Sequence, residues 1–313
     1  MVINEKEGSC ALIISAILNS RISTTNMSGE IRPGGILIPI GGAEDRGEEL
    51  NPKLPFEEKG VLKHVIDEAK GADSKVVVVT TASSIPKEVF SQYRDGFVRL
   101  GCKSIKHFHS TDKSDCDNAE VIKAFSEADV IMFSGGNQSK LPKCMGDTAL
   151  LRLIHDRYMT EPVVIAGTSA GAMAMSKNMI AGGSASEAFV KGAVKLKEGF
   201  GLIPELIIDT HFVRRGRFGR LAEAVAKHPN CIGIGLAEDS GLIIKQGELF
   251  RVIGSGMAIV MDPRTLSHNN HEVLETGTLM SVVGLTTHFL ANGDQFRFSD
   301  HSTKILPLGS ELI

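Results

Sequence analysis

Short apolar runs of β type alternate with amphipathic helical patterns along most of this chain. The β-type runs are rich in valine and isoleucine, and they cover Gly35–Ile40, Lys75–Thr80, Ser104–His109, Asp129–Phe133, Pro162–Ala166, Leu206–Thr210 and Cys231–Ala237. The helical patterns between them cover Phe56–Lys70, Lys87–Leu100, Asn118–Ala128, Thr148–Tyr158, Ala170–Met179 and Arg217–Lys227. Strands that alternate with helices predict an α/β fold, with a mainly parallel sheet covered by helices on both faces.

The pattern changes beyond Asp239. Short β-type runs with glycine-containing turns follow at Gly241–Ile244, Leu249–Ile253, Ala258–Met261 and near Leu279–Leu290. We expect short antiparallel strands there, as an extension of the same domain, because no linker, repeat or low-complexity segment precedes them. The sequence thus predicts a single α/β domain over residues 34–313, preceded by an N-terminal arm of residues 1–33.

Composition and charge narrow the classes of function. The chain has 313 residues, a net charge of −3 and 5% aromatic residues, so we expect neither nucleic acid nor a membrane as a partner. The apolar stretch Cys10–Leu18 is shorter than a membrane span and lacks a basic segment before it, which disfavours an export signal. Five scattered cysteines and ten dispersed histidines show no metal-ligand spacing, so we predict a cytoplasmic protein with no metal and no cofactor.

The pentapeptide Gly167-Thr168-Ser169-Ala170-Gly171 carries the clearest chemical signal. It follows a β-type run and opens a helical one, which is the context of a nucleophile elbow. The glycines permit a tight turn that holds the Ser169 hydroxyl at the end of the strand. The backbone N–H of Ala170, at the start of the helix, is placed to stabilise an oxyanion.

A base and an acid for this serine are expected at the same edge of the sheet, because ligands of open parallel sheets collect at the carboxyl ends of the strands. His211 ends the predicted strand Leu206–Thr210 and is the best candidate base. Glu238 ends the next predicted strand, whereas Glu187 lies in a loop rich in Gly, Ser and Ala after the elbow helix. Glu238 is favoured as the acid because its strand end fixes it better, and Glu187 remains the alternative.

Four arginines lie within seven residues, Arg214 to Arg220, where a helix begins. Cations at this end oppose the helix dipole, so a role other than solvation is indicated. Arg217 and Arg220 share one helical face, and guanidinium groups bind carboxylates in a bidentate manner. The segment therefore predicts a substrate rich in carboxylates. Gly136 offers a second N–H for an oxyanion, and Gln138 offers an amide to orient the substrate.

Several of these segments together resemble the cyanophycinases, which are serine exopeptidases of the peptidase E-like group. Order and spacing agree from about Gly34 to the C-terminal strands, and the matching motifs are GGNQ at 135–138, GTSAGA at 167–172, DTHFVRRGRFGRL at 209–221 and GIGLAED at 233–239. The resemblance implies a fold like that of the class I glutamine amidotransferases and flavodoxins. It also implies hydrolysis of cyanophycin, a poly-aspartate backbone with arginine on each β-carboxylate, to β-Asp-Arg dipeptides.

The same resemblance assigns roles to individual residues. It implies Ser169 as nucleophile, His211 as base, and Glu238 or Glu187 as the third member of the triad. It implies substrate binding by Gln138, Asp209, Arg215, Arg217 and Arg220. It further implies a homodimer that uses no cofactor and takes a peptide polymer as substrate.

Two departures from the family pattern concern the substrate site. Thr210 replaces a residue that is usually glutamine, and Asn137 stands where an aspartate is common. Specificity is therefore less firmly predicted than mechanism, and a dipeptidase of the peptidase E type that cleaves aspartyl peptides is the nearest alternative. A lipase or esterase is disfavoured because its order is Ser, acid, His. A polymer-binding homologue without activity is disfavoured by the intact serine, histidine and glutamate.

Overall fold

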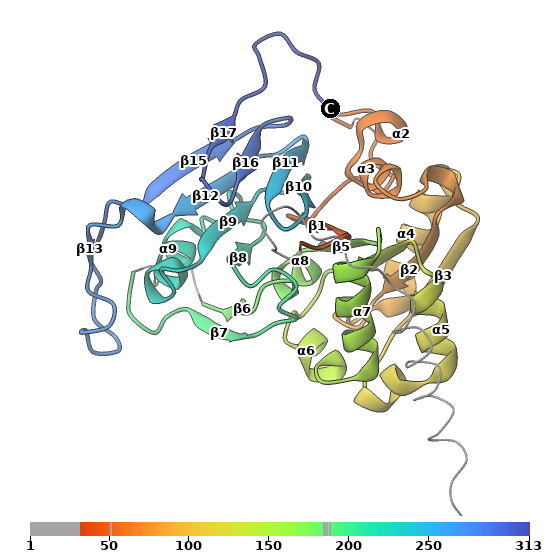
Figure 1. Cartoon of the computed structure of the whole chain (residues 1–313), viewed down its shortest axis with the longest axis horizontal. Coiled ribbons are helices and arrows are strands. Elements are labelled where there is room, and N and C mark those ends of the chain that lie inside the picture. Colours follow the sequence, from red (N-terminus) through yellow and green to blue (C-terminus); the bar gives the residue numbers. More distant parts are fainter. Residues whose placement is uncertain (1–31, 51, 184–186, 188) are drawn as a thin grey trace, which may run out of the picture.

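A nine-stranded mixed sheet forms the centre of the protein (Figure 1). The computed structural model describes residues 32–50, 52–183, 187 and 189–313. Across this sheet the strands run in the order β17-β16-β11-β10-β1-β5-β4-β2-β3. Five of them are parallel, namely β1 (Ile36–Ile40), β2 (Lys75–Val79), β3 (Ser104–Phe108), β4 (Val130–Phe133) and β5 (Val164–Thr168). The predicted α/β class with a parallel core is confirmed.

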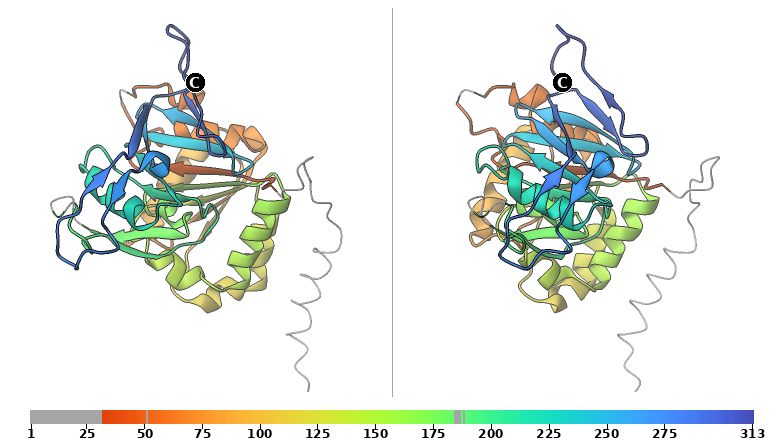
Figure 2. Two further views of the ribbon diagram at one scale, coloured as in Figure 1. Left: turned by 60° about the vertical axis from the view of Figure 1, so that its left-hand side comes forward. Right: turned by 90° about the vertical axis from the view of Figure 1, so that its left-hand side faces the viewer.

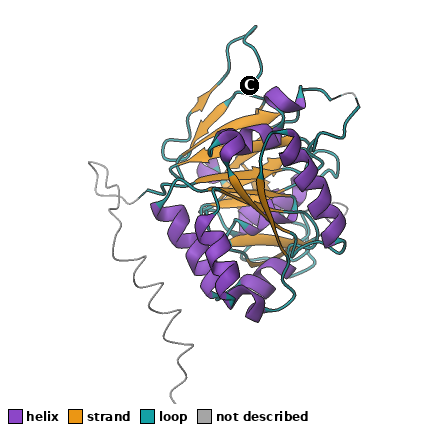
Figure 3. Ribbon diagram, turned by 90° about the vertical axis from the view of Figure 1, so that its right-hand side faces the viewer, coloured by secondary structure: helices purple, strands orange, loops and turns teal. Residues whose placement is uncertain are grey.

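Helices cover both faces of the parallel strands, as Figure 3 shows. One face packs against α2 (Phe56–Lys59), α3 (Val61–Asp67) and α4 (Pro86–Arg99). The opposite face packs against α5 (Ala119–Glu127), α6 (Lys140–Met145), α7 (Ala149–Thr160) and α8 (Ala170–Ala174). In β2, Val76 and Val78 point to the first face, whereas Val77 and Val79 point to the second. This period of two, with apolar side chains in both positions, explains why the strand reads as a continuous valine run.

The C-terminal strands extend the sheet in antiparallel fashion. They are β10 (Ser240–Lys245), β11 (Leu249–Gly254), β16 (Gln295–Arg297) and β17 (Thr303–Lys304), and β10 pairs with β1. The predicted antiparallel extension is therefore confirmed, and it begins directly beside the strand that also pairs with β5.

A second, four-stranded sheet corrects one expectation. It has the order β15-β12-β9-β8, from β8 (Leu206–Asp209), β9 (Ile232–Leu236), β12 (Ala258–Asp262) and β15 (Thr286–Leu290), and α9 (Phe218–Lys227) packs on it. The strands before His211 and Glu238 thus belong to this sheet. They were expected in the nine-stranded sheet, where β5 ends next to Ser169. Periodicity marks a strand but not its neighbours, which depend on pairing between distant segments.

Two predicted helices are shorter than expected. The pattern over Phe56–Lys70 is divided at Gly60, whose extended backbone (φ −65°, ψ 149°) separates α2 from α3. The run after the elbow leaves the helix beyond Ala174 and continues into β6 (Asn178–Gly182), which pairs with β7 (Lys195–Glu198). A further two-stranded hairpin, β13 (His268–Asn269) with β14 (Val282–Val283), projects from the four-stranded sheet (Figures 1 and 2).

The predicted N-terminal arm falls almost entirely outside the described residues, which begin at Arg32. Among the helices of the described ranges, none combines the length and the apolar character that crossing a bilayer requires.

Candidate active site

The turn at Ser169 has the backbone of a nucleophile elbow. β5 ends at Thr168, α8 begins at Ala170, and Ser169 between them has φ 50° and ψ −105°. Such a positive φ is costly for a residue with a side chain, and it persists where surrounding contacts fix it. Gly171 makes the turn possible, because a Cβ there would lie 2.6 Å from the carbonyl oxygen of Phe133. The turn therefore holds the Ser169 side chain out from the end of the parallel sheet.

His211 and Glu238 lie in line with this serine. The Nε2 atom of His211 is 3.1 Å from the Oγ of Ser169, and its Nδ1 atom is 2.7 Å from the Oε1 of Glu238. The side chains of His211 and Glu238 are 14% and 23% exposed, so the pair is screened from bulk water yet open to a ligand. A hydroxyl, an imidazole and a carboxylate in this order form the hydrogen-bonded chain of a serine hydrolase.

The charge of Glu238 is supported from two sides. Its Oε2 atom accepts a hydrogen bond from Nη1 of Arg214 at 2.9 Å. Partial burial by itself raises the pKa of Glu238, but the hydrogen bonds from His211 and Arg214 outweigh this desolvation and leave the pKa lowered. Glu238 is therefore a carboxylate at neutral pH, able to stabilise a protonated His211.

Glu187, the alternative acid, has a different environment. It is exposed, and its backbone carbonyl accepts a hydrogen bond from Val190 N–H. The Nδ1 atom of His211 is already engaged by Glu238.

The residues at the end of β1, which the sequence analysis did not single out, connect the turns at Ser169, His211 and Glu238. Three successive carbonyl oxygens at the end of β1 accept backbone N–H bonds from the site, namely Ile40 from Ser169 at 2.9 Å, Gly41 from His211 at 2.8 Å and Gly42 from Asp239 at 2.9 Å. Ser169, His211 and Asp239 all have φ near +50°. Two adjacent glycines directly after the first predicted strand were the available signal. Both are sterically required, because a Cβ at Gly41 would lie 1.8 Å from Ala237 O and one at Gly42 would lie 2.4 Å from the His211 ring.

The two predicted oxyanion donors come from different elements. Ala170 is the first residue of α8, and Gly136 belongs to the loop after β4. Its neighbour Gly135 contacts the serine closely, since a Cβ there would lie 3.5 Å from Cβ of Ser169. Within the described ranges, neither Gly136 N–H nor Ala170 N–H has a hydrogen-bond partner in the protein, so both are free for a ligand oxygen.

The predicted arginines divide into a buried and an exposed group. Arg220 is buried, and its Nε donates to Oδ2 of Asp209 at 2.8 Å, while Arg217 Nη1 lies 3.1 Å from Oδ1 of the same carboxylate. Asp209 is completely buried. Arg215, in contrast, is exposed. Sequence reasoning assigned Arg217 and Arg220 to substrate carboxylates, whereas in this structure both bind an internal one, and desolvation lowers the pKa of Arg217.

The other residues named for the substrate site differ in their hydrogen-bond partners. Gln138 donates from Nε2 to Ile180 O at 2.9 Å. Asn137 accepts from Ser139 N–H at 3.0 Å, which orders the loop after β4. Thr210 is buried, and its Oγ1 atom has no hydrogen-bond partner among the described residues.

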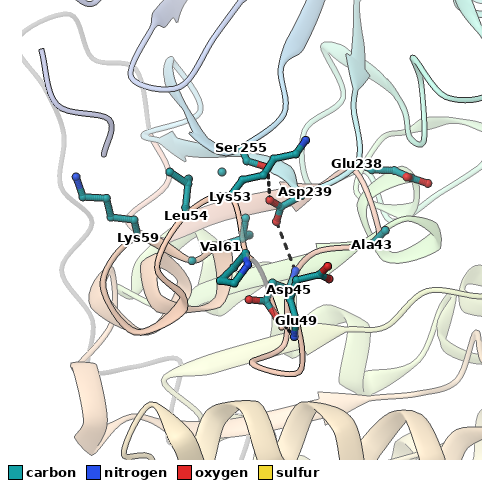
Figure 4. Close-up of a pocket in the computed structure, with 13 residues that line it drawn as sticks. Ala43, Asp45, Glu49, Lys53, Leu54, Lys59, Val61, Glu238, Asp239 and Ser255 are labelled. Carbon is teal, nitrogen blue, oxygen red and sulfur yellow. Dashed lines mark hydrogen bonds between the residues drawn. The ribbon is translucent and has the colours of Figure 1, made fainter. Parts of the chain in front are cut away.

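A pocket of about 250 Å³ adjoins Glu238 (Figure 4). Asp239 lies on its wall, accepting hydrogen bonds from Ser255 Oγ and from the backbone N–H of Asp45. Lys53 and Lys59 contribute cations and Glu49 a further carboxylate to the lining, so the pocket suits polar rather than acyl groups.

Comparison with known proteins identifies the family of this chain. The family model described as Peptidase family S51 matches residues 54–252. The cyanophycinase of Trichormus variabilis is 30% identical over 273 residues, covering 87% of each chain, and that of Geminocystis herdmanii is 31% identical over 265 residues, covering 85% of this chain and 94% of its own. A peptidase structure from an acI-B1 Actinobacterium superposes with a TM-score of 0.62 at 22% identity, over 87% of this chain and all of that one, which shows a shared fold.

The matched range contains the elbow, the His211 turn and Glu238. The family model covers more than half of the chain, and the relatives cover most of it. The resemblance predicted from the four sequence motifs is confirmed at the level of the family. The chain belongs to peptidase family S51 and is a serine-type peptidase.

Proposed function

We propose that this peptidase hydrolyses cyanophycin to β-Asp-Arg dipeptides through a triad of Ser169, His211 and Glu238. The observation that carries the mechanism is the hydrogen-bonded chain from Ser169 Oγ to His211 Nε2 and from His211 Nδ1 to Glu238. The observation that carries the substrate is the 30–31% identity to enzymes named cyanophycinase.

In the first step, Ser169 Oγ attacks the carbonyl carbon of a backbone peptide bond while His211 takes the hydroxyl proton. The negative charge on the carbonyl oxygen is stabilised by the N–H groups of Gly136 and Ala170. His211 then returns the proton to the leaving amine, and the bond between carbon and nitrogen breaks. A water molecule hydrolyses the resulting ester by the reverse sequence and frees Ser169. Glu238 holds the imidazole in the tautomer that this proton transfer needs.

Substrate recognition is assigned to the residues around the His211 turn. Arg215 is exposed and suits a substrate carboxylate, while Gln138 is half-buried and, with its Nε2 donating to Ile180 O, offers its amide oxygen. Asp209, Arg217 and Arg220 contribute as one ion-paired unit, since the two guanidinium groups already bind that carboxylate. A homodimer in the cytoplasm is part of the same proposal and is implied by the family resemblance and the cysteine pattern.

One observation favours a second candidate, an aspartyl or isoaspartyl dipeptidase. A guanidinium on each substrate unit needs a free carboxylate in the site, and Asp209 is fully buried and bound by two arginines. Thr210 also stands where the cyanophycinase pattern has glutamine. A dipeptidase would need fewer contacts for arginine side chains.

Incubation of the purified protein with insoluble cyanophycin, with products identified by mass spectrometry, tests both candidates. We expect wild-type protein to release β-Asp-Arg, and Ser169→Ala to release none, since loss of a triad nucleophile lowers kcat by roughly a millionfold. Cleavage of small β-aspartyl peptides with no action on the polymer would transfer the assignment to the dipeptidase. Turnover retained by a folded Ser169→Ala variant would contradict the serine mechanism itself.

A further inference from the structure

A buried carboxylate lies directly behind the nucleophile elbow and touches none of the three triad side chains. It belongs to Glu44, in the loop that follows β1, and its side chain is completely buried. Its Oε2 atom accepts a hydrogen bond from Thr168 Oγ1 at 2.6 Å. Thr168 is the last residue of β5 and directly precedes Ser169. The carboxylate is thus one side chain and one peptide bond away from the nucleophile.

The second oxygen of Glu44 is also engaged. Oε1 accepts a hydrogen bond from the Tyr93 hydroxyl, and the Nε atom of Arg46 lies 3.5 Å away. The guanidinium of Arg46 covers the Tyr93 ring at 4.5 Å from its centroid. Burial and the nearby Glu44 carboxylate raise the pKa of Tyr93 well above its ordinary value, so its hydroxyl remains a donor. A buried carboxylate is tolerated only with such partners, and here each oxygen has one.

We propose that Glu44 is a positioning residue of the nucleophile, which sets the elbow through its hydrogen bond to Thr168. This role rests on the proposed function, because it takes Ser169 as the nucleophile. The elbow is then held from two directions by one segment of chain: the Ser169 N–H binds Ile40 O at 2.9 Å, and the preceding side chain binds Glu44.

The position of Glu44 in the chain explains why this contact affects reactivity. The same segment accepts the His211 N–H through Gly41, and its Asp45 N–H donates to Asp239 Oδ1 at 3.4 Å, next to Glu238. The hydrogen bond from Thr168 to Glu44 therefore fixes Ser169 relative to the segment after β1. The same segment holds the backbone of His211 through Gly41. Without the hydrogen bond from Thr168 to Glu44, Ser169 keeps its backbone bond to Ile40. Its unusual φ of 50° then loses one of the contacts that restrain it.

A merely structural role for Glu44 makes a different prediction. In that case both hydroxyl partners of the carboxylate contribute to stability, and neither has a special effect on the serine. The two partners thus provide matched variants, since Thr168→Val and Tyr93→Phe each remove one hydroxyl from the same carboxylate. Thr168→Ser keeps the hydroxyl and is the conservative rescue of Thr168→Val.

The test measures the rate at which diisopropyl fluorophosphate labels Ser169, together with the thermal unfolding midpoint of each variant. In this reaction Ser169 Oγ forms a bond to phosphorus, fluoride leaves, and the hydroxyl proton passes to His211. The probe carries no part of cyanophycin, so the result does not depend on the substrate assignment. All rates are taken on protein that is folded at the temperature of the assay.

We expect Thr168→Val and Glu44→Met each to slow labelling about tenfold to a hundredfold, because both remove the hydrogen bond and misplacement of a reacting group by about 1 Å costs up to about a hundredfold. Thr168→Ser should restore most of the rate, and Tyr93→Phe should lower the unfolding midpoint while labelling stays close to wild type. In the double variant Glu44→Met/Thr168→Val, the loss should not exceed that of one single variant, since both act through one contact.

Two results would overturn the positioning role. Equal slowing by Tyr93→Phe and Thr168→Val, in proportion to their loss of stability, would leave Glu44 as a structural group. Labelling at the wild-type rate in folded Thr168→Val and Glu44→Met would do the same. Absence of label on wild-type protein, as on Ser169→Ala, would reject the nucleophile itself and is thereby distinguished from both.

Discussion

The proposed nucleophile and the proposed acid–base pair come from two different sheets. Ser169 leaves the nine-stranded sheet at the end of β5, between strands that are buried on both faces. His211 and Glu238 follow β8 and β9 of the four-stranded sheet, which has α9 packed on it. The 3.1 Å between Ser169 Oγ and His211 Nε2 is thus a distance between two sheets.

The comparison shows where the precision of this site originates. Neither sheet alone determines the triad, because a shift of one against the other would separate the serine from the imidazole. The end of β1 joins the two, since carbonyl oxygens of Ile40, Gly41 and Gly42 bind one residue at each of the three turns. Substitutions on either side of this junction, and at the junction itself, should therefore have different effects.

The largest effect is expected on the side of the four-stranded sheet. Glu238→Gln keeps the shape of the acid but does not stabilise a protonated His211, so kcat should fall about ten-thousandfold, as for other triad acids. Glu187→Gln is the matched control and should leave kcat close to wild type. Steady-state kinetics on cyanophycin measures both. A larger fall for Glu187→Gln would mean that Glu187 folds back to become the acid when substrate binds.

The ion pair beneath the His211 turn should control stability more than chemistry. Asp209→Asn leaves the buried Arg220 without its counter-charge, so the free energy of unfolding should fall by about 3–5 kcal/mol. Arg215→Gln, at an exposed arginine of the same segment, should leave stability unchanged and raise KM instead. Urea unfolding followed by circular dichroism separates the two. Unchanged stability of Asp209→Asn would show that Arg220 finds another partner.

At the junction itself, Gly42→Ala should displace the base. A Cβ at this position would lie 2.4 Å from Cε1 and 2.6 Å from Nε2 of His211, so the ring must move and kcat should fall about a hundredfold. Gly216→Ala provides the control, because Gly216 also has a positive φ but no atom lies within 4 Å of a Cβ there. Comparable losses in both variants would assign the effect to backbone strain and not to the imidazole.

The smallest effect concerns the titration of the Glu238 carboxyl. Arg214 is mostly exposed, and its hydrogen bond helps to lower the pKa of Glu238. In Arg214→Gln this pKa rises, so Glu238 is protonated at a higher pH as the solution is acidified. The titration of the Glu238 carboxyl, followed by NMR, should move upward by about half a pH unit relative to wild type. A downward shift would contradict the stabilising role of Arg214.

The spacing of apolar and polar residues along the sequence predicted much of the architecture. The five parallel strands and the helices on both of their faces follow from local apolar patterns, which every buried strand and amphipathic helix must carry. The turn at Ser169 was predictable from its G-x-S-x-G motif between a strand and a helix, although the contact that excludes a side chain at Gly171 comes from the distant Phe133. By contrast, the prediction that β8 and β9 end at the same sheet edge as β5 was wrong. The pattern of apolar residues in a strand does not specify which strand it pairs with.

The sequence by itself thus determined the class of fold, the family and the turn at Ser169, because these are carried by local patterns and motifs. Only the tertiary structure decided which groups meet. It paired His211 with Glu238 and directed Arg217 and Arg220 toward Asp209. It also brought Glu44 against Thr168, 124 positions apart in the chain. Such pairings depend on burial and on distances between separate sheets, and a buried charge binds whichever opposite group the packed fold brings within reach.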